Sequence, residues 1–222
     1  MNIVYALTSN FVELARPSMR SLLEHNPKAK IYLLTDGEVK SDIPMTVIDI
    51  SDRHEFDNSV NIRNNFGGVI NLLKVEYAEI LKVNKVIHLD ADTIICDSLE
   101  PMWKTDLTGK WVGAVQEYRG SYRPFGERYY NMGVAVINLA QMRKEKIIPE
   151  MVEYLNTVKQ PYVDQDAWHK FGMDKFVDLP VRYNESTVTD KTDNPAIVHF
   201  CGYTHWYNDW RIPRKEYLEK YR

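Results

Sequence analysis

The chain has 222 residues, of which 44% are hydrophobic and 27% charged, and its formal net charge at pH 7 is −3. This balance is typical of a globular protein with a sizeable core, and without a basic excess we expect no nucleic-acid partner. No apolar run in the sequence approaches the roughly 18 residues of a membrane-spanning helix.

The first half of the chain alternates between predicted strands and helices. Runs rich in Ile, Val, Leu and Tyr predict strands over 2–7, 30–37, 45–50 and 86–89. A helix is predicted over 11–26, after the capping side chains of residues 8–10, and Pro17 is expected to kink or break it. A second helix is predicted over 69–82, where apolar residues recur at helical spacing, and a long polar loop over 51–68 precedes it.

The second half of the chain is more mixed. Strands are predicted over 111–117, 132–139 and 196–202, and helices over 140–158, interrupted at Pro149, and 164–172. Residues 118–130 are expected to form a loop rich in Arg, Tyr and Gly. The β–α–β alternation predicts an α/β fold with a mixed, mostly parallel sheet flanked by helices. No repeat or linker divides the sequence, so we expect residues 1–222 to form a single domain.

The two ends of the chain and its cysteines predict a cellular setting. The opening MNIVYALTSN lacks the basic and long apolar regions of a signal peptide. The basic, aromatic run over 210–222 predicts a short amphipathic helix against the core, although its composition also permits peripheral contact with a membrane. Cys96 and Cys201 have no paired spacing, so we expect a reduced, cytoplasmic protein.

The stretch most informative about function is KVIHLDADTII, residues 85–95. A buried strand ends there in Asp90 and Asp92, with only the methyl group of Ala91 between them. In an open α/β sheet, ligands bind outside the carboxyl ends of the strands. A carboxylate pair at such a place can hold a divalent cation, serve as acid and base, or cap the next turn. Apolar sequence on both sides puts the pair beside the core, where unpaired charge is costly.

A metal site needs a further ligand, and the histidines differ in their settings. His25, His54 and His169 lie in contexts that look solvated, and His88 alternates within the strand as a satisfied core or surface residue. His199 lies near the end of the strand predicted over 196–202, which closes in the small Gly202, and this is typical of a strand that leads into a site. Two carboxylates and one imidazole suit manganese or magnesium better than structural zinc.

Five segments, in order along residues 2–208, resemble those of glycosyltransferase family 8, which includes glycogenin and bacterial lipopolysaccharide galactosyl- and glucosyltransferases. They are NIVYALTSN, KVIHLDADTIICDSLEPMW, YYNMGVAVINL, VDQDAWH and IVHFCGYTHWYN. The resemblance implies a GT-A (Rossmann-like) fold and a retaining hexosyltransferase. Its donor would be a UDP-sugar, with UDP-glucose or UDP-galactose favoured, and its cofactor Mn²⁺, with Mg²⁺ as the alternative.

The resemblance also implies roles for individual residues. The expected metal ligands are Asp90, Asp92 and His199, in a motif that includes Ala91. The expected contacts of the donor nucleotide and diphosphate are Ala6, Thr8, Asn10, Lys74, Gly202 and His205. The expected surroundings of the transferred sugar are Asn131, Asp164 and Gln165. Lys74 has an alternative interpretation as a solvated helix lysine. Two mechanisms would retain the configuration of the sugar: same-face transfer, in which the acceptor attacks from the face that UDP leaves, and a covalent sugar intermediate on Asp164.

Two departures from the family pattern bear on the donor site. His205 stands where the family usually has a lysine that holds the diphosphate, and Thr8 stands where bacterial galactosyltransferases carry an acid. The first leaves open a non-catalytic UDP-sugar-binding protein of the same fold. A sugar nucleotidyltransferase is disfavoured because no Gly-rich, basic loop follows the first strand. The acceptor is expected to be a carbohydrate, a glycan or a protein, and its identity stays open.

Overall fold

A computed structural model describes residues 1–62, 68–118, 126, 128–202 and 214–221. Its central sheet has seven strands in the order β3-β2-β1-β4-β7-β6-β8. The strand bounds are β1 Asn2–Ala6, β2 Lys30–Thr35, β3 Thr46–Asp49, β4 Lys85–Leu89, β6 Val112–Gln116, β7 Tyr130–Asn138 and β8 Phe176–Asp178. Only the two pairings of β7, with β4 and β6, are antiparallel. The sheet is therefore mixed and mostly parallel, as predicted.

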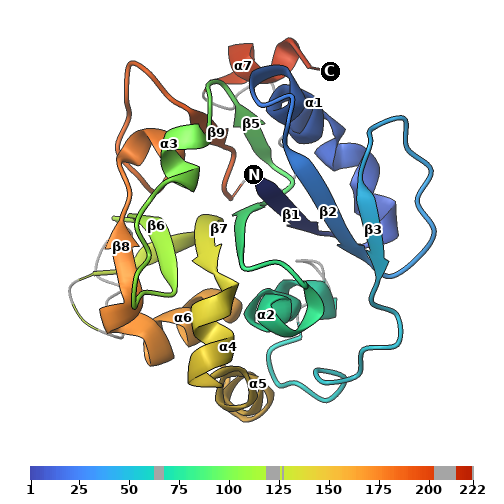
Figure 1. Ribbon diagram of the computed structural model, residues 1–222, viewed down its shortest axis with the longest axis vertical. Coiled ribbons are helices and arrows are strands. Elements are labelled where there is room, and N and C mark those ends of the chain that lie inside the picture. Colours follow the sequence, from blue (N-terminus) through green and yellow to red (C-terminus); the bar gives the residue numbers. More distant parts are fainter. Residues whose placement is uncertain (63–67, 119–125, 127, 203–213, 222) are drawn as a thin grey trace.

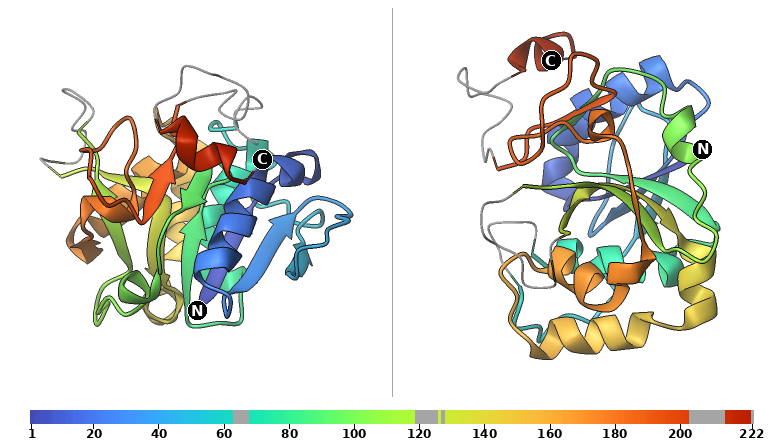
Figure 2. Two further views of the ribbon diagram at one scale, coloured as in Figure 1. Left: turned by 90° about the horizontal axis from the view of Figure 1, so that it is seen from above. Right: turned by 90° about the vertical axis from the view of Figure 1, so that its left-hand side faces the viewer.

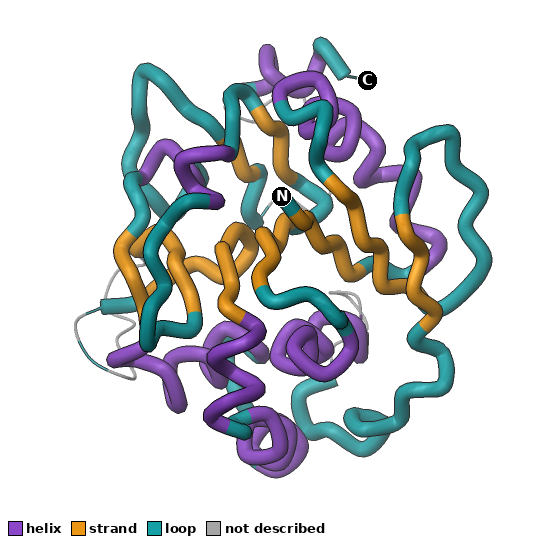
Figure 3. Tube along the Cα trace, in the orientation of Figure 1, coloured by secondary structure: helices purple, strands orange, loops and turns teal. Residues whose placement is uncertain are grey.

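Helices cover both faces of this sheet (Figures 1 and 3). Their bounds are α1 Arg16–His25, α2 Tyr77–Ile80, α3 Glu100–Trp103, α4 Leu139–Glu145, α5 Ile148–Thr157 and α6 Asp164–Gly172. One core lies between the sheet and a layer formed by α2, α4, α5 and α6. A second core lies on the opposite face, under α1 and α3. Alternate residues of β1 and β2 enter the two cores, as the period of two in a strand requires.

A second, two-stranded sheet lies on the same side as α1 (Figure 2). It pairs β5, Thr93–Ile95, antiparallel with β9, Ile197–His199. The C-terminal helix α7, Lys215–Glu219, packs on it through the fully buried Leu218. Ion pairing of Lys220 with Glu24 ties the end of the chain to α1. The amphipathic helix predicted against the core is thus confirmed for this part of the run.

The prolines start helices instead of bending them. Pro17 lies in the first turn of α1, after a separate 3-10 segment over Ser9–Ala15, and Pro149 lies in the first turn of α5. The predicted break at Pro17 and the predicted interruption at Pro149 are therefore confirmed: a new helix starts at each proline, because a first-turn proline loses no helical hydrogen bond. The helix predicted over 69–82 is α-helical only at Tyr77–Ile80. The preceding Gly68–Glu76 forms a 3-10 helix.

The strand order creates a switch point in the centre of the sheet. The chain runs outward from β1 to β2 and β3 and then returns to place β4 on the other side of β1. Crevices at such points, outside the carboxyl ends of the strands, are where open α/β sheets bind ligands. Ala6 and Asp90 therefore come to the same edge. That residues 1–222 form a single domain stays a prediction.

Candidate metal and donor site

Backbone pairing holds the predicted metal ligands together. Asp90 follows β4, and its N–H donates to the carbonyl of Gly133 on β7 at 2.8 Å. In the two-stranded sheet His199 pairs with Thr93, and the N–H of Phe200 donates to the carbonyl of Asp92 at 2.8 Å. Segments more than 100 residues apart thus meet at the carboxyl end of β4.

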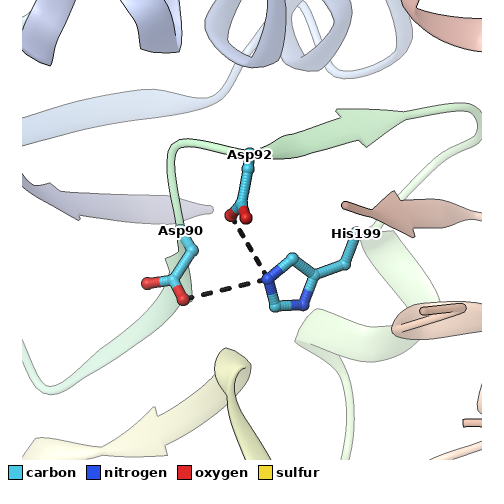
Figure 4. Close-up of side chains that lie close together, drawn as sticks. All are labelled: Asp90, Asp92 and His199. Atoms are coloured by element: carbon cyan, nitrogen blue, oxygen red, sulfur yellow. Dashed lines mark ion pairs between the residues drawn. The ribbon is translucent and has the colours of Figure 1, made fainter. Parts of the chain in front are cut away.

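Asp90, Asp92 and His199 offer one ligand atom each within 4.8 Å of one another (Figure 4). His199 Nε2 lies 3.2 Å from Asp92 Oδ1 and 3.9 Å from Asp90 Oδ2. The His199 side chain is 3% exposed, whereas Asp92 and Asp90 are 23% and 32% exposed. Burial alone would lower the pKa of His199, but the charges of Asp92 and Asp90 together with the hydrogen bond to Asp92 raise it above its ordinary value. The three side chains converge on one point that is open to solvent on the carboxylate side.

Gly133 makes room for this cluster. A Cβ on Gly133 would lie 2.4 Å from His199 Cε1 and 2.5 Å from Asp90 Oδ2. Glycine inside a strand often marks the close approach of another group, and here that group is the pair of predicted ligands. The missing Cβ of Gly133 therefore lets Asp90 and His199 approach each other beside β7.

The two oxygens of Asp90 have different surroundings. Oδ1 accepts hydrogen bonds from Lys74 Nζ and His88 Nε2, both at 2.9 Å, and Tyr77 donates to His88 Nδ1 at 3.0 Å. Burial alone would raise the pKa of Asp90, but the charge of Lys74 and the His88 hydrogen bond hold that pKa far below its ordinary value. Oδ2 is the oxygen that faces His199. The protein therefore orients the carboxylate and keeps it ionised.

Lys74 is a buried residue and not a solvated helix lysine. Its ammonium group also lies 3.8 Å from Asp164 Oδ2. Burial would lower the pKa of Lys74, but the charges of Asp164 and Asp90 keep it above its ordinary value. One cation thus stands between the carboxylate of the cluster and the start of α6.

Asp164 and Gln165 open α6 beside this lysine. Burial raises the pKa of Asp164 to about 6, and its Oδ2 has no hydrogen-bond partner among the described residues. The preceding Val163 has φ 53° and ψ −119°, an unfavourable conformation for a β-branched residue. Gln165 Oε1 accepts from the N–H of Met132 at 3.0 Å, and its amide nitrogen makes no hydrogen bond within the described part of the chain.

The other predicted residues lie in different surroundings. Ala6 is buried at the end of β1, and Thr8 donates to Asn10 Oδ1 at 2.5 Å nearby. Asn131 is buried, with its amide oxygen and nitrogen bonded within the protein. Gly202 has φ 87°, a left-handed conformation that favours glycine. His205 lies outside the described residues, as does most of the 118–130 loop.

One prediction about the histidines was wrong. His169 is fully buried and not solvated, because its ring stacks on Tyr129 and accepts a hydrogen bond from the N–H of Tyr130 at 2.7 Å. Burial lowers its pKa to about 4. His88 was predicted to be a hydrogen-bonded core or surface residue, and it lies in the core. Its Nε2 also donates to Asp90 of the metal motif.

The sequence of this chain matches the model of glycosyl transferase family 8 over residues 2–210. The fold and the match together define the class of protein, a glycosyltransferase with the GT-A fold. The chain belongs to glycosyl transferase family 8. Within the described residues, no helix combines the length and the apolar character that crossing a membrane requires.

Two of the three relatives described here carry glycosyltransferase names. General stress protein A of Bacillus subtilis is 22% identical, with 98% of this chain and 92% of that protein covered. Glycosyltransferase GlyA of Streptococcus pneumoniae is 24% identical, with 93% of this chain but 32% of the relative covered. Lipopolysaccharide glucosyltransferase WaaO of Escherichia coli is 24% identical, with 85% and 58% covered. The chain thus spans most of one relative and about a third of another.

Solved structures share the fold. The galactosyltransferase LgtC, crystallised with donor and acceptor sugar analogues, superposes with a TM-score of 0.81 at 24% identity, covering 99% of this chain and 94% of that one. The glycosyltransferase GlyE of Streptococcus pneumoniae superposes with a TM-score of 0.77 at 19% identity, covering 99% and 59%. At these identities the likeness establishes the GT-A fold and not the substrates.

Proposed function

We propose that this chain is a retaining hexosyltransferase that moves glucose or galactose from a UDP-sugar to an acceptor hydroxyl and depends on a divalent metal. The observation that carries the proposal is the convergence of Asp90, Asp92 and His199 at the switch point of the sheet. Lys74 and the start of α6 stand beside this cluster. The acceptor is a carbohydrate, a glycan or a protein.

The three side chains proposed as metal ligands support Mn²⁺, with Mg²⁺ as the alternative. Carboxylate oxygens suit both ions and an imidazole favours manganese. In this proposal Asp90 offers Oδ2, Asp92 offers Oδ1 and His199 offers Nε2. A bound divalent cation would supply positive charge that stabilises the negative charge developing on the diphosphate as the sugar–phosphate bond breaks.

The donor nucleotide is proposed to lie across the ends of β1 and β4. Ala6, Thr8 and Asn10 would line the uridine pocket, and Ala91 would lie along the donor within the metal motif. Gly202 and His205 would meet the diphosphate. Gly202 has no Cβ, which permits its left-handed backbone and would let that backbone approach the phosphates. Lys74 would contribute a buried positive charge near the donor, held in place by two carboxylates.

The sugar is proposed to lie over the start of α6. Burial raises the pKa of Asp164 to about 6, and its carboxylate form would stabilise positive charge on the sugar. The amide nitrogen of Gln165 is available to donate to the sugar or the leaving group. We favour same-face transfer with these two residues in positioning roles, and Asn131 is proposed to complete the sugar's surroundings. The alternative within this proposal is a covalent sugar intermediate on Asp164.

Incubation of the purified protein with a panel of UDP-sugars and Mn²⁺, with UDP release as the readout, tests this function. We expect slow release from one UDP-hexose without an acceptor and faster release with the right acceptor. A protein that binds UDP-sugars under calorimetry but releases no UDP, with or without acceptors, would instead be a non-catalytic binder. Matched assays with GDP-sugars provide the control for donor class.

A further inference from the structure

The side of His199 that faces away from the metal motif is held by a buried asparagine. His199 Nδ1 lies 2.9 Å from Asn184 Oδ1, and Asn184 is fully buried. Because the amide oxygen accepts only, Nδ1 carries the proton. The lone pair of the neutral ring is then on Nε2, the nitrogen that faces Asp90 and Asp92 in Figure 4.

Asn184 is itself oriented by a chain of buried groups. Its Nδ2 donates to Asn131 Oδ1 at 2.9 Å, and Asn131 Nδ2 donates to Glu117 Oε2 at 3.1 Å. The N–H of Gly133 donates to the same Asn131 oxygen at 3.0 Å. A backbone N–H only donates and a carboxylate only accepts, so the Gly133 N–H identifies the amide oxygen of Asn131 and the Glu117 carboxylate identifies its amide nitrogen. The Asn131 oxygen in turn identifies the amide nitrogen of Asn184. Glu117 thus orients the side chain of Asn131, which orients that of Asn184, and Asn184 orients the ring of His199.

We propose that Asn184 is a positioning residue that presents His199 Nε2 to the metal, and that Asn131 and Glu117 hold Asn184 in that orientation. This inference rests on the metal centre of the proposed function. An amide suits the position because it fixes the tautomer of the ring without adding a third carboxylate behind Asp90 and Asp92. Removal of such a partner behind a metal ligand typically lowers metal affinity 10- to 100-fold.

The test is pulsed electron paramagnetic resonance of Mn²⁺ alone added to an excess of the protein, where modulation from a directly bound ¹⁴N reports the His199–metal bond. Wild type is expected to show this modulation. Asn184→Leu is expected to lose or weaken it and to bind Mn²⁺ 10- to 100-fold less tightly. Asn184→Asp keeps an acceptor for Nδ1–H and is expected to retain the nitrogen signal, even if it is less stable.

Asn26→Leu is the matched control for loss of a buried asparagine. Asn26 is also buried and bonds the backbone of Asp97 and Leu99, away from the cluster. It is expected to lower the melting temperature and leave the nitrogen signal unchanged. Wild-type affinity and nitrogen modulation in Asn184→Leu would overturn the positioning role while leaving the proposed function intact. Absence of any nitrogen-bound Mn²⁺ in wild type would overturn the metal centre as well.

Discussion

Replacement of Gly133 by alanine places a methyl group inside the proposed metal cluster. The added Cβ would lie 2.4 Å from His199 Cε1 and 2.5 Å from Asp90 Oδ2. These distances are about 1 Å shorter than a comfortable contact of roughly 3.5 Å between carbon atoms. Both neighbours are held from behind, His199 by Asn184 and Asp90 by Lys74 and His88. One of the two proposed ligands must therefore move away.

The expected magnitudes separate metal binding from stability. Overpacking of a buried site costs typically about 1–3 kcal/mol of folding free energy. Displacement of a ligand is expected to weaken Mn²⁺ binding at least 10-fold, which is about 1.4 kcal/mol. Gly113→Ala is the matched control, because its Cβ would lie 2.9 Å from a side-chain carbon of Val136 on the neighbouring strand, outside the cluster. It is expected to cost stability with little effect on the metal.

Mn²⁺ titration of both variants, followed by the loss of the free-ion resonance signal, and thermal unfolding of the same samples give the two quantities. Gly133→Ala is expected to lose Mn²⁺ affinity and metal-dependent UDP release together. Wild-type Mn²⁺ affinity in Gly133→Ala would refute the argument that this glycine makes room for an ion held by Asp90 and His199.

Two further predictions concern a ligand and a buried histidine. Asp92→Ala should abolish Mn²⁺-dependent UDP release without unfolding the protein. The control Asp57→Ala, at an exposed aspartate, should leave UDP release unchanged. Undiminished turnover of Asp92→Ala would contradict the role of Asp92 as a ligand. The pKa of His169 in the folded state is about 4, below its ordinary 6.5. As pH falls, this histidine is therefore protonated in the unfolded chain before it is protonated in the folded protein. The free energy of unfolding consequently decreases between about pH 6.5 and pH 4. Between pH 7.5 and 5 wild type should lose about 2 kcal/mol more unfolding free energy in urea than His169→Gln, and equal losses would contradict the buried neutral ring.

The elements with strong local signals were predicted from the sequence. Helix α6 runs over Asp164–Gly172 as expected, and β4 ends at Leu89, directly before the predicted metal motif. Strand β8, Phe176–Asp178, was not expected because three residues carry no period of their own and its pairing with β6 decides the conformation. Short strands of this kind are fixed by tertiary contacts.

The candidate site was predictable where a motif carried it. Asp90, Asp92 and His199 lie together as the resemblance implied. The glycine in the segment YYNMGVAVINL is a second local signal, because a glycine inside a strand often marks the close approach of another group. Asn184 carries no such signal, because its role depends on the distant Asn131 and His199. Buried hydrogen-bond partners of this kind follow from the fold and not from spacing.

A crystal grown with Mn²⁺ and UDP tests the central claim most directly, because manganese produces an anomalous-difference peak that locates the ion. The account predicts one strong peak bonded to Asp90, Asp92 and His199 Nε2 and to the diphosphate of UDP, with the uridine near Ala6 and Thr8. A peak elsewhere, or UDP bound at this edge of the sheet with no manganese among these three side chains, would contradict it.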